Sequence, residues 1–270
     1  MPRAGGGDAQ PVAGKTSDYA AAPSVLTIVI PHRTDPARLG RLLETLGDWP
    51  LIVADDSDDG VQLGVPTVRL GGGFGFAKCV NAGLAMVKTP LALVLNDDAQ
   101  PEADCLEKLA VAADEGVPVG PVLRGPNGIE SAGIAVSGWG RVRQITELPA
   151  DESLLSVAAV SGACMRISAN ARFDERFPHG FEDVELCRRL GGARLHPSAT
   201  CRHEGGGTLD RRSPEASAKA VTGQLLLFPP GWREPVIVAL HVAQVLREGG
   251  RVGRFGAIAT GWAAARARRG

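Results

Sequence analysis

The first half of the chain alternates short apolar runs with segments of helical periodicity, and this pattern constrains the fold most. Runs rich in Val, Leu and Ile have the length of buried strands. They are residues 25–30, 51–54, 67–70 and 91–95. The segments with apolar residues at helical spacing are 36–46, 77–87 and 101–113. Strands that alternate with helices favour an α/β fold with a mainly parallel sheet.

The second half is less regular. An apolar run lies near residues 155–164, and the pattern predicts a helix over 181–190 and a strand over 194–201. Helical patterns begin again near Ser213. We therefore expect a disordered segment over 1–22, which is rich in Gly and Ala, a catalytic domain over 23–230 and a helical, basic segment over 231–270.

Composition excludes several classes of function. The 270 residues carry a formal net charge of −1, which gives no general attraction to nucleic acid. The 5 cysteines are scattered and without a CxxC pair, which favours reduced thiols in a cytoplasm over a disulfide framework. No apolar stretch reaches the roughly 18 residues of a membrane span. We expect a cytoplasmic protein.

Polar clusters follow three of the predicted strands. They are Pro31-His32-Arg33, Asp55-Asp56-Ser57 and Asn96-Asp97-Asp98. In open α/β sheets ligands bind beyond the carboxyl ends of the strands, so these clusters are candidates for a common site. The alternative for the acids after the second strand is a solvated turn that ends at Gly60.

Asn96-Asp97-Asp98 raises an electrostatic problem, because two adjacent carboxylates repel and are costly to bury unpaired. A hard divalent cation such as Mg²⁺ or Mn²⁺, already carrying a diphosphate, would resolve it. The alternative is a helix cap, in which Asp98 or Gln100 precedes a helix that begins near Pro101.

Two further segments carry weaker signals. "GGGFGFAK" is a glycine-rich turn before a helix, where backbone N–H groups and Lys78 would suit phosphate, or else a flexible loop with an exposed lysine. Glu182 and Asp183 fall in the first turn of a predicted helix, where one of them would act as a general base or both would simply suit the helix dipole. His203, before three glycines, would suit a metal or phosphate contact, although a lone histidine is usually structural.

The order of these segments resembles family 2 glycosyltransferases with the GT-A fold, and most of all their rhamnosyltransferase-like and galactofuranosyltransferase-like branch. The likeness spans about residues 25–210. The segments that carry it are "TIVIPHR", "VADDSDDG", "GGFGFAKCVNAGL", "LVLNDDA", "SGACMRI", "RFDERFPHGFEDVELCRRL" and "HEGGGT". The resemblance implies one domain with a mainly parallel, Rossmann-like sheet flanked by helices.

The resemblance also implies roles for single residues. Asp55 matches the acid that contacts the nucleotide base, and Asp98 matches the metal-binding acid. His203 matches a histidine at the metal or diphosphate, and Asp183 matches the base, with Glu182 beside it. Mn²⁺ or Mg²⁺ is the expected cofactor. The expected nucleotide-sugar contacts are Pro31, Arg33, Asp55, Gly73, Lys78, Asn96 and Asp97, and from position alone we expect the acceptor at Trp139, His179 and Phe181.

The predicted function is inverting transfer of a sugar from a dTDP-rhamnose or UDP-sugar type of donor to a hydroxyl of a cell-surface glycan or lipid-linked acceptor. The alternatives are a tailoring enzyme for a soluble secondary metabolite and a non-catalytic nucleotide-sugar binding module. A sugar-nucleotide pyrophosphorylase is disfavoured, since no glycine-rich loop follows the first strand. In residues 250–270, arginines with an intervening Phe and Trp favour a peripheral contact with an anionic membrane over a solvated tail.

Overall fold

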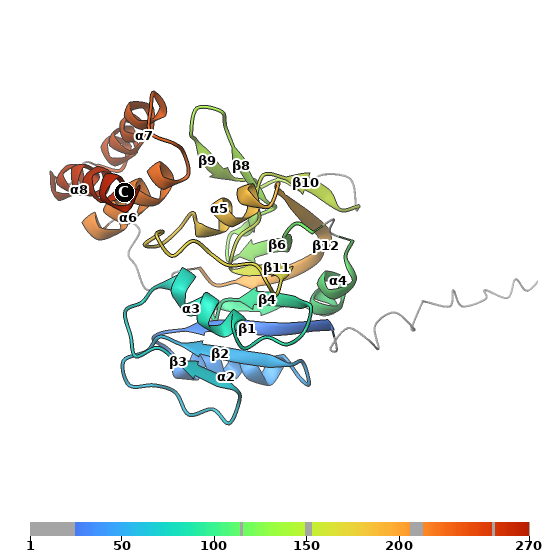
Figure 1. The fold of residues 1–270 in the computed structure, drawn as a ribbon. Helices are drawn as coiled ribbons and strands as arrows, with labels where there is room; N and C mark the ends of the chain where they lie inside the picture. The colour runs from blue at the N-terminus through green and yellow to red at the C-terminus, as the bar shows by residue number, and fades with distance from the viewer. Residues whose placement is uncertain (1–24, 114–115, 149–152, 206–212, 250–251, 270) are drawn as a thin grey trace, which may run out of the picture.

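The computed structural model describes residues 25–113, 116–148, 153–205, 213–249 and 252–269. The segment 1–22, predicted to be disordered, lies outside the described residues. A sheet of 10 strands forms the centre of the molecule, in the order β10-β12-β6-β11-β4-β1-β2-β3, with β5 paired to β12 and β7 to β6. Figure 1 shows this sheet with helices on either side of it.

The amino-terminal half of the sheet is parallel. Its strands are β1 (Leu26–His32), β2 (Leu51–Asp55), β3 (Thr67–Arg69) and β4 (Leu91–Leu95). The helices that connect them are α2 (Pro36–Thr45) and α3 (Phe76–Leu84). These strands and helices confirm the predicted α/β alternation. Because β1, β2 and β4 run in one direction, their polar carboxyl ends meet at one edge of the sheet.

The carboxy-terminal half adds antiparallel pairs. It contains β5 (Ala99–Pro101), α4 (Cys105–Val111), β6 (Val119–Gly125), β7 (Gly128–Ser131), β8 (Ile134–Val136), β9 (Val142–Gln144), β10 (Leu155–Val157), β11 (Cys164–Ser168), α5 (Glu182–Arg189) and β12 (Ala193–His203). β11 is antiparallel to both β4 and β6, whereas β12 lies parallel to β6. β8 and β9 form a separate hairpin.

The two faces of the sheet are buried by different helices. Alternate residues of β1 point to opposite faces, as in any strand. Ile28 and Ile30 pack in the cluster that contains Leu39 of α2, whereas Val29 packs with Val80 of α3. The nearly continuous burial of β1, which only Pro31 interrupts, therefore reflects a strand covered on both sides.

The helix predicted over 101–113 is wrong at its start. Gln100 and Pro101 instead pair with Arg202 and Cys201 in β12, and α4 begins only at Cys105. Asp104 precedes α4 in the left-handed region, with φ of 61°, which prevents an earlier helical start. Neither Asp98 nor Gln100 therefore caps this helix.

Three helices end the described chain: α6 (Pro214–Leu226), α7 (Arg233–Arg247) and α8 (Val252–Arg269). They gather beside the β8–β9 hairpin, at the end of the molecule opposite α2 (Figure 1). The glycines that lower helix propensity in α8 have a packing role at Gly261, where an added Cβ atom would collide with the carbonyl oxygen of Ala218 in α6. In the described residues, no helix combines the length and apolarity that a membrane span requires.

Candidate active site

A cleft of about 340 Å³ lies at the carboxyl ends of β1, β2 and β4. The ends of these strands line it together with Arg38 of α2 (Pro36–Thr45), the start of α3, the segment before α5 and the start of α6. The cleft brings together six of the predicted site residues, with further neighbours at the ends of β1 and β2. Its predicted members are Pro31, Arg33, Asn96, Asp97, Asp98 and His179.

Protein groups compensate one of the two adjacent carboxylates at the end of β4, that of Asp97. Its Oδ2 lies 2.7 Å from Nδ1 of His32, and its Oδ1 accepts a hydrogen bond of 2.6 Å from Nη2 of Arg38. Asp97 is 9% exposed and His32 is 2% exposed, so this contact is almost completely shielded from water. The carboxylate is thus neutralised by protein groups, and its neighbour Asp98 is the acid left for a ligand.

Asp98 faces His203 from the end of β12. Nε2 of His203 lies 3.3 Å from Oδ1 of Asp98, while Nδ1 of the same ring lies 2.8 Å from Oε2 of Glu130. Burial alone would lower the pKa of His203, but the two carboxylates raise it to about 10. Burial would likewise raise the pKa of Asp98, but His203 and Arg38 hold it below its ordinary value. The structure therefore brings the two predicted metal ligands together.

The donor atoms around Asp98 fit a divalent cation bound partly by its substrate. Oδ1 of Asn96 is buried and accepts no hydrogen bond from the described residues, and the buried Oδ1 of Asp98 has only the 3.3 Å contact with His203. The described chain holds no group of three or more His, Cys, Asp or Glu side chains arranged as a complete metal site. Such a partial set suits Mg²⁺ or Mn²⁺, which commonly take one or two protein ligands and complete their shell with phosphate and water.

The acids after β2 divide into two roles. Asp55 is fully buried, and its two oxygens accept hydrogen bonds from Ser57 and from the backbone N–H of Val61. Asp56, rather than Asp55, lines the cleft. It accepts bonds of 3.0 and 3.1 Å from the backbone N–H groups of Phe74 and Gly75. Asp55 thus fixes the shape of its own loop, and Asp56 ties the glycine-rich turn to the cleft.

Of the glycine-rich turn, the end lines the cleft and the middle does not. Gly75, with φ of 84°, and Phe76 line the cleft as α3 begins. Gly73 lies outside the residues that line it, and the ammonium of Lys78 lies 4.0 Å from the ring centroid of Phe74. Lys78 faces a different hollow, between β3 and the segment after β11. The structure therefore does not bring Gly73 and Lys78 to the other predicted nucleotide contacts.

Asp183 lies at the first turn of α5, beside the strand end that carries Asn96. Its Oδ2 accepts a 3.0 Å hydrogen bond from the N–H of Gly162, and its Oδ1 accepts one of 2.7 Å from the N–H of Val184. The next residue after Gly162, Ala163, accepts a 2.9 Å bond from the N–H of Asn96. Two backbone donors thus fix the Asp183 carboxylate. One of them, Gly162, directly precedes the residue that pairs with Asn96 after the end of β4.

Glu182 differs from Asp183 in its protonation. Burial, and then the charge of Asp183, raise the pKa of Glu182 to about 8, so this carboxyl keeps its proton at neutral pH. Its Oε2 is buried and has no hydrogen-bond partner among the described residues. Burial also raises the pKa of Asp183, although the N–H groups of Gly162 and Val184 oppose that shift. Of the two acids, Asp183 is the one prepared to accept a proton.

Phe181 holds these acids in place through an unusual backbone. It adopts φ of 70°, which is strained for a residue with a bulky side chain. Phe181 packs in the core rather than in the cleft wall, and His179 lies in the wall. Trp139 is 42% exposed in the turn of the β8–β9 hairpin and does not line the cleft. Of the three predicted acceptor contacts, only His179 faces the cleft.

The sequence analysis missed several residues of the cleft. Arg38 on α2 and the pair Glu215 and Lys219 on α6 belong to it, although none of them falls within a motif of the sequence analysis. Arg38 lies in the first turn of α2, the helix that follows the polar end of β1, which is a usable signal. Glu215 and Lys219 face each other across one turn of α6 at 2.8 Å, and only the tertiary packing of α6 brings them to the site.

Comparison with known proteins agrees with this fold. The family profile described as "Glycosyl transferase family 2" matches residues 27–172, more than half of the chain. The chain belongs to this family, and it is a glycosyltransferase with the GT-A fold. The predicted family and fold are thereby confirmed. A search among curated protein sequences gives no significant match.

Solved structures of low sequence identity share the fold. A structure of GalNAc-T7 with UDP, GalNAc and Mn²⁺ is 12% identical with a TM-score of 0.61 and covers 75% of this chain, which in turn spans only 47% of that protein. Staphylococcus aureus TarS 1–349 in complex with UDP-GlcNAc is 13% identical, with a TM-score of 0.56 and coverage of 89% and 81%. The mannosyltransferase PcManGT from Pyrobaculum calidifontis with GDP-Man and Mn²⁺ is 16% identical, with a TM-score of 0.52 and coverage of 91% and 82%.

Proposed function

We propose that the chain transfers a sugar from a nucleotide-diphosphate donor to an acceptor hydroxyl with inversion at the anomeric carbon. The observation that carries this proposal is the pairing of Asp98 with His203 at the end of β4, close to a separately held Asp183. Departure of a nucleoside diphosphate needs positive charge at one place, and attack by a hydroxyl needs a base at another. Asp98 lies in the cleft beside His203, and Asp183, which does not itself line the cleft, is held next to the strand end that carries Asn96.

The donor's diphosphate would lie against the ends of β1 and β4. Arg33 and Arg38 line that part of the cleft, and guanidinium groups suit phosphate. Asp98 and His203, with Asn96 beside them, would hold a divalent cation, which when bound would neutralise charge on the leaving diphosphate. Mn²⁺ in the GalNAc-T7 and PcManGT structures, and UDP or GDP-Man bound there, support this choice of cofactor and donor class.

Asp183 is the proposed general base. Its two hydrogen bonds from N–H groups fix the carboxylate in one orientation, and a base so oriented can take the proton of an attacking hydroxyl. Attack from the face opposite the leaving group inverts the anomeric carbon and needs no covalent sugar–enzyme intermediate. Glu182, which keeps its proton at neutral pH, is proposed as a support for this acid.

The acceptor remains a proposal from sequence resemblance. The branch suggested by that resemblance uses dTDP-rhamnose or UDP-galactofuranose donors and builds cell-surface glycans, and His179 would lie on the acceptor side of the cleft. A soluble secondary metabolite is the second candidate acceptor. A non-catalytic binding module is the less favoured proposal, because Asp98, His203 and Asp183 are all held in place by specific contacts.

The test is donor binding and donor hydrolysis in the presence and absence of Mn²⁺. We expect UDP or dTDP to raise the melting temperature with Mn²⁺ and to do so much less after chelation. Asp98→Ala and His203→Ala should each weaken this binding, and the double variant should lose less than the sum, since both contact one site. Unchanged Mn²⁺-dependent binding in both single variants would remove these residues from the proposed metal site.

Contacts within the protein engage some of the arginines in residues 250–270 that were expected to meet the membrane. Arg254 is 5% exposed and donates to Ser217 and Glu248, and Arg269 contacts Glu234. Arg266, over the ring of Trp262, stays exposed. A peripheral contact would therefore involve Trp262 and Arg266. Trp262→Ala should then lower co-sedimentation with anionic liposomes, and equal sedimentation of variant and wild type would contradict it.

A further inference from the structure

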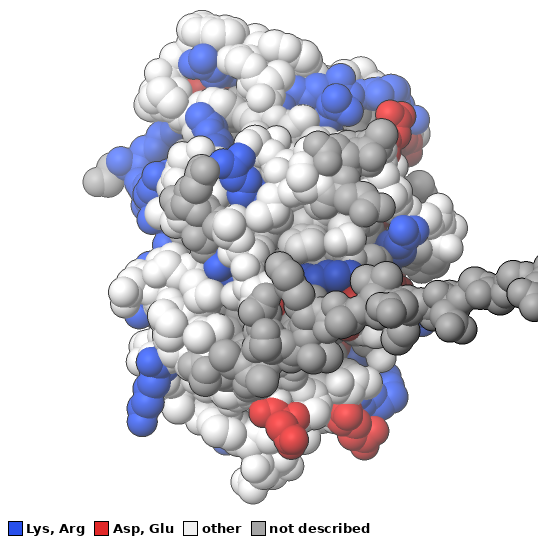
Figure 2. Space-filling model, turned by 90° about the vertical axis from the view of Figure 1, so that its right-hand side faces the viewer, with Lys and Arg blue, Asp and Glu red and all other residues white. Residues whose placement is uncertain are grey.

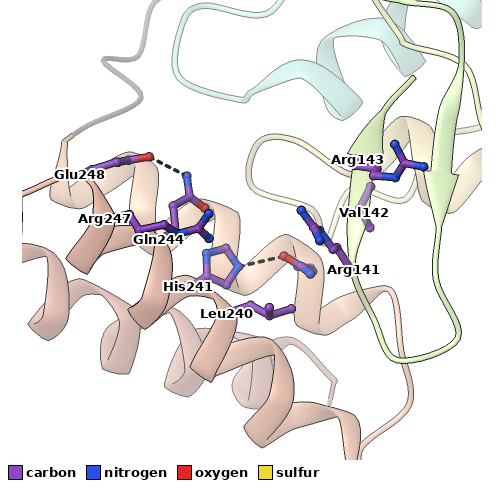
Figure 3. A pocket seen from close by; sticks show the side chains of 9 residues that line it. Arg141, Val142, Arg143, Leu240, His241, Gln244, Arg247 and Glu248 are labelled. Atoms are coloured by element: carbon purple, nitrogen blue, oxygen red, sulfur yellow. Dashed lines mark hydrogen bonds between the residues drawn. The ribbon is translucent and has the colours of Figure 1, made fainter. Parts of the chain in front are cut away.

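A second cavity, of about 510 Å³, lies between the β8–β9 hairpin and α7 and shares no lining residue with the donor cleft. Its size is that of a small-molecule site. Figure 3 shows side chains from the hairpin and from α7 facing each other across it. The polar lining comes from Arg141 and Arg143 on the hairpin, Gln224 on α6, and His241, Gln244 and Arg247 on α7.

The lining of this cavity is positively charged. It includes three arginines, Arg141, Arg143 and Arg247, and a single acid, Glu248. That acid is already engaged, because its Oε2 accepts a 2.6 Å bond from the largely buried Arg254 and its Oε1 accepts one of 3.0 Å from Gln244. Its charge is therefore balanced from inside the helix bundle, and the arginines give the cavity a net positive charge. Figure 2 draws the side of the molecule that faces away from α7, and Lys and Arg side chains gather in the upper part of that face as well.

His241 adds a hydrogen-bond acceptor of defined orientation. Nε2 of Gln224 donates to the carbonyl oxygen of Gly140 at 2.6 Å, which turns its Oε1 toward Nε2 of His241 at 2.9 Å. The histidine must therefore carry its proton on Nε2 (Figure 3). Burial, and then the charge of Arg254, lower the pKa of His241 to about 4, so the ring is neutral and Nδ1 is a free acceptor at neutral pH.

We propose that this cavity binds the phosphate ester of a polyol, with Arg141 and Arg247 at the phosphate and Nδ1 of His241 accepting a hydroxyl hydrogen. The Arg141 side chain points from the hairpin toward α7, whereas the head of Arg143 turns away (Figure 3). Planar guanidinium groups from two facing elements match the oxygens of one phosphate. An acceptor nitrogen beside them selects a ligand that also carries a hydroxyl. This site is independent of the proposed sugar transfer.

Two sources carry the same chemistry, a soluble glycerol or sugar phosphate and a phospholipid headgroup. The full-length protein is first saturated with UDP and Mn²⁺, so that the donor cleft does not take up the probe. Glycerol phosphate is then titrated by calorimetry. We expect Arg141→Gln and Arg247→Gln each to weaken binding by roughly tenfold or more, the usual effect of losing a charge-assisted hydrogen bond. Both side chains are exposed, so the variants should fold normally.

Arg41→Gln is the matched control, because Arg41 is an exposed arginine on α2 at the other end of the molecule. It should bind glycerol phosphate like the wild type. In a second arm, sedimentation with phosphatidylglycerol but not phosphatidylcholine vesicles, lost in Arg141→Gln, would assign the lipid source. Glycerol phosphate binding without vesicle binding would assign a soluble one. Equal affinity in all variants, or no binding of either probe by the wild type, would overturn the proposal.

Discussion

Gly223 of α6 lies so close to Phe181 that a Cβ atom on the glycine would stand 2.8 Å from Cδ2 of the phenylalanine. The same atom would stand 2.8 Å from the carbonyl oxygen of Gly180. Phe181 is the residue with the strained φ that precedes Glu182 and Asp183. The close approach of α6 thus supports the turn from which the proposed base projects, and it links the carboxy-terminal helices to the chemistry.

Gly223→Ala should therefore impair both stability and transfer. The new methyl group meets backbone, which cannot rotate away, so α6 or the 180–181 turn must move. We expect the free energy of unfolding to fall by about 1–3 kcal/mol, the usual cost of overpacking. The rate of sugar transfer should fall as well, because Asp183 shifts with the turn. Urea denaturation and initial rates measure the two effects.

Gly256→Ala is the control for this substitution. Gly256 is exposed in α8 and nothing lies within 4 Å of an added Cβ atom. Alanine there should raise the free energy of unfolding by roughly 0.5–1 kcal/mol through helix propensity and leave transfer unchanged. If Gly223→Ala behaved in the same way, the close contact with Phe181 would have no structural importance.

Asp183→Asn should retain the fold and donor binding but lose transfer. The change is nearly isosteric and removes the basic oxygen, and a positioned general base typically contributes about 10²–10⁴-fold to rate. The comparison is Glu182→Gln, which replaces a carboxyl that is already protonated at neutral pH and should cost far less. Rates within a few-fold of wild type in Asp183→Asn, with a large loss in Glu182→Gln, would exchange the two roles.

The buried Glu182 also predicts how stability depends on pH. Its pKa is raised from 4.5 to about 8 in the folded protein, so the folded state holds a proton that the unfolded state releases. Its contribution is complete below pH 4.5 and is lost as the pH rises through about 8, with a slope of at most about 1.4 kcal/mol per pH unit. The free energy of unfolding of wild type minus that of Glu182→Gln, measured from pH 5 to 9, should therefore decrease. A flat difference would show that Glu182 is ionised throughout.

The sequence predicted the parallel half of the fold well, because its elements follow local rules. β4 has the predicted bounds, and α2 begins at the predicted Pro36, after Asp35 caps it. The antiparallel half was harder. Pro101 reads locally as a helix start, yet its backbone pairs with Cys201, a contact about a hundred residues away that no local pattern reports.

The candidate site shows the same division. Asn96, Asp97 and Asp98 were found because a strand end places them together. Their division of roles depended on partners distant in sequence, since Asp97 meets Arg38 and Asp98 meets His203. Asp55 and Asp56 are adjacent acids that no sequence rule distinguishes. The structure distinguishes them, because Asp55 bonds within its own loop and Asp56 lines the cleft.

The contacts of Asp97 give the last prediction. Asp97→Asn should lower the free energy of unfolding by about 1–3 kcal/mol, because an amide cannot accept hydrogen bonds from both His32 and Arg38 and leaves one buried donor unpaired. Asp59→Asn, in the exposed turn after β2, changes the same charge and should have an effect within about 0.5 kcal/mol. Urea denaturation of both variants makes the comparison. Equal, small effects would mean that water already satisfies Arg38, and that Asp97 is as available to a ligand as Asp98.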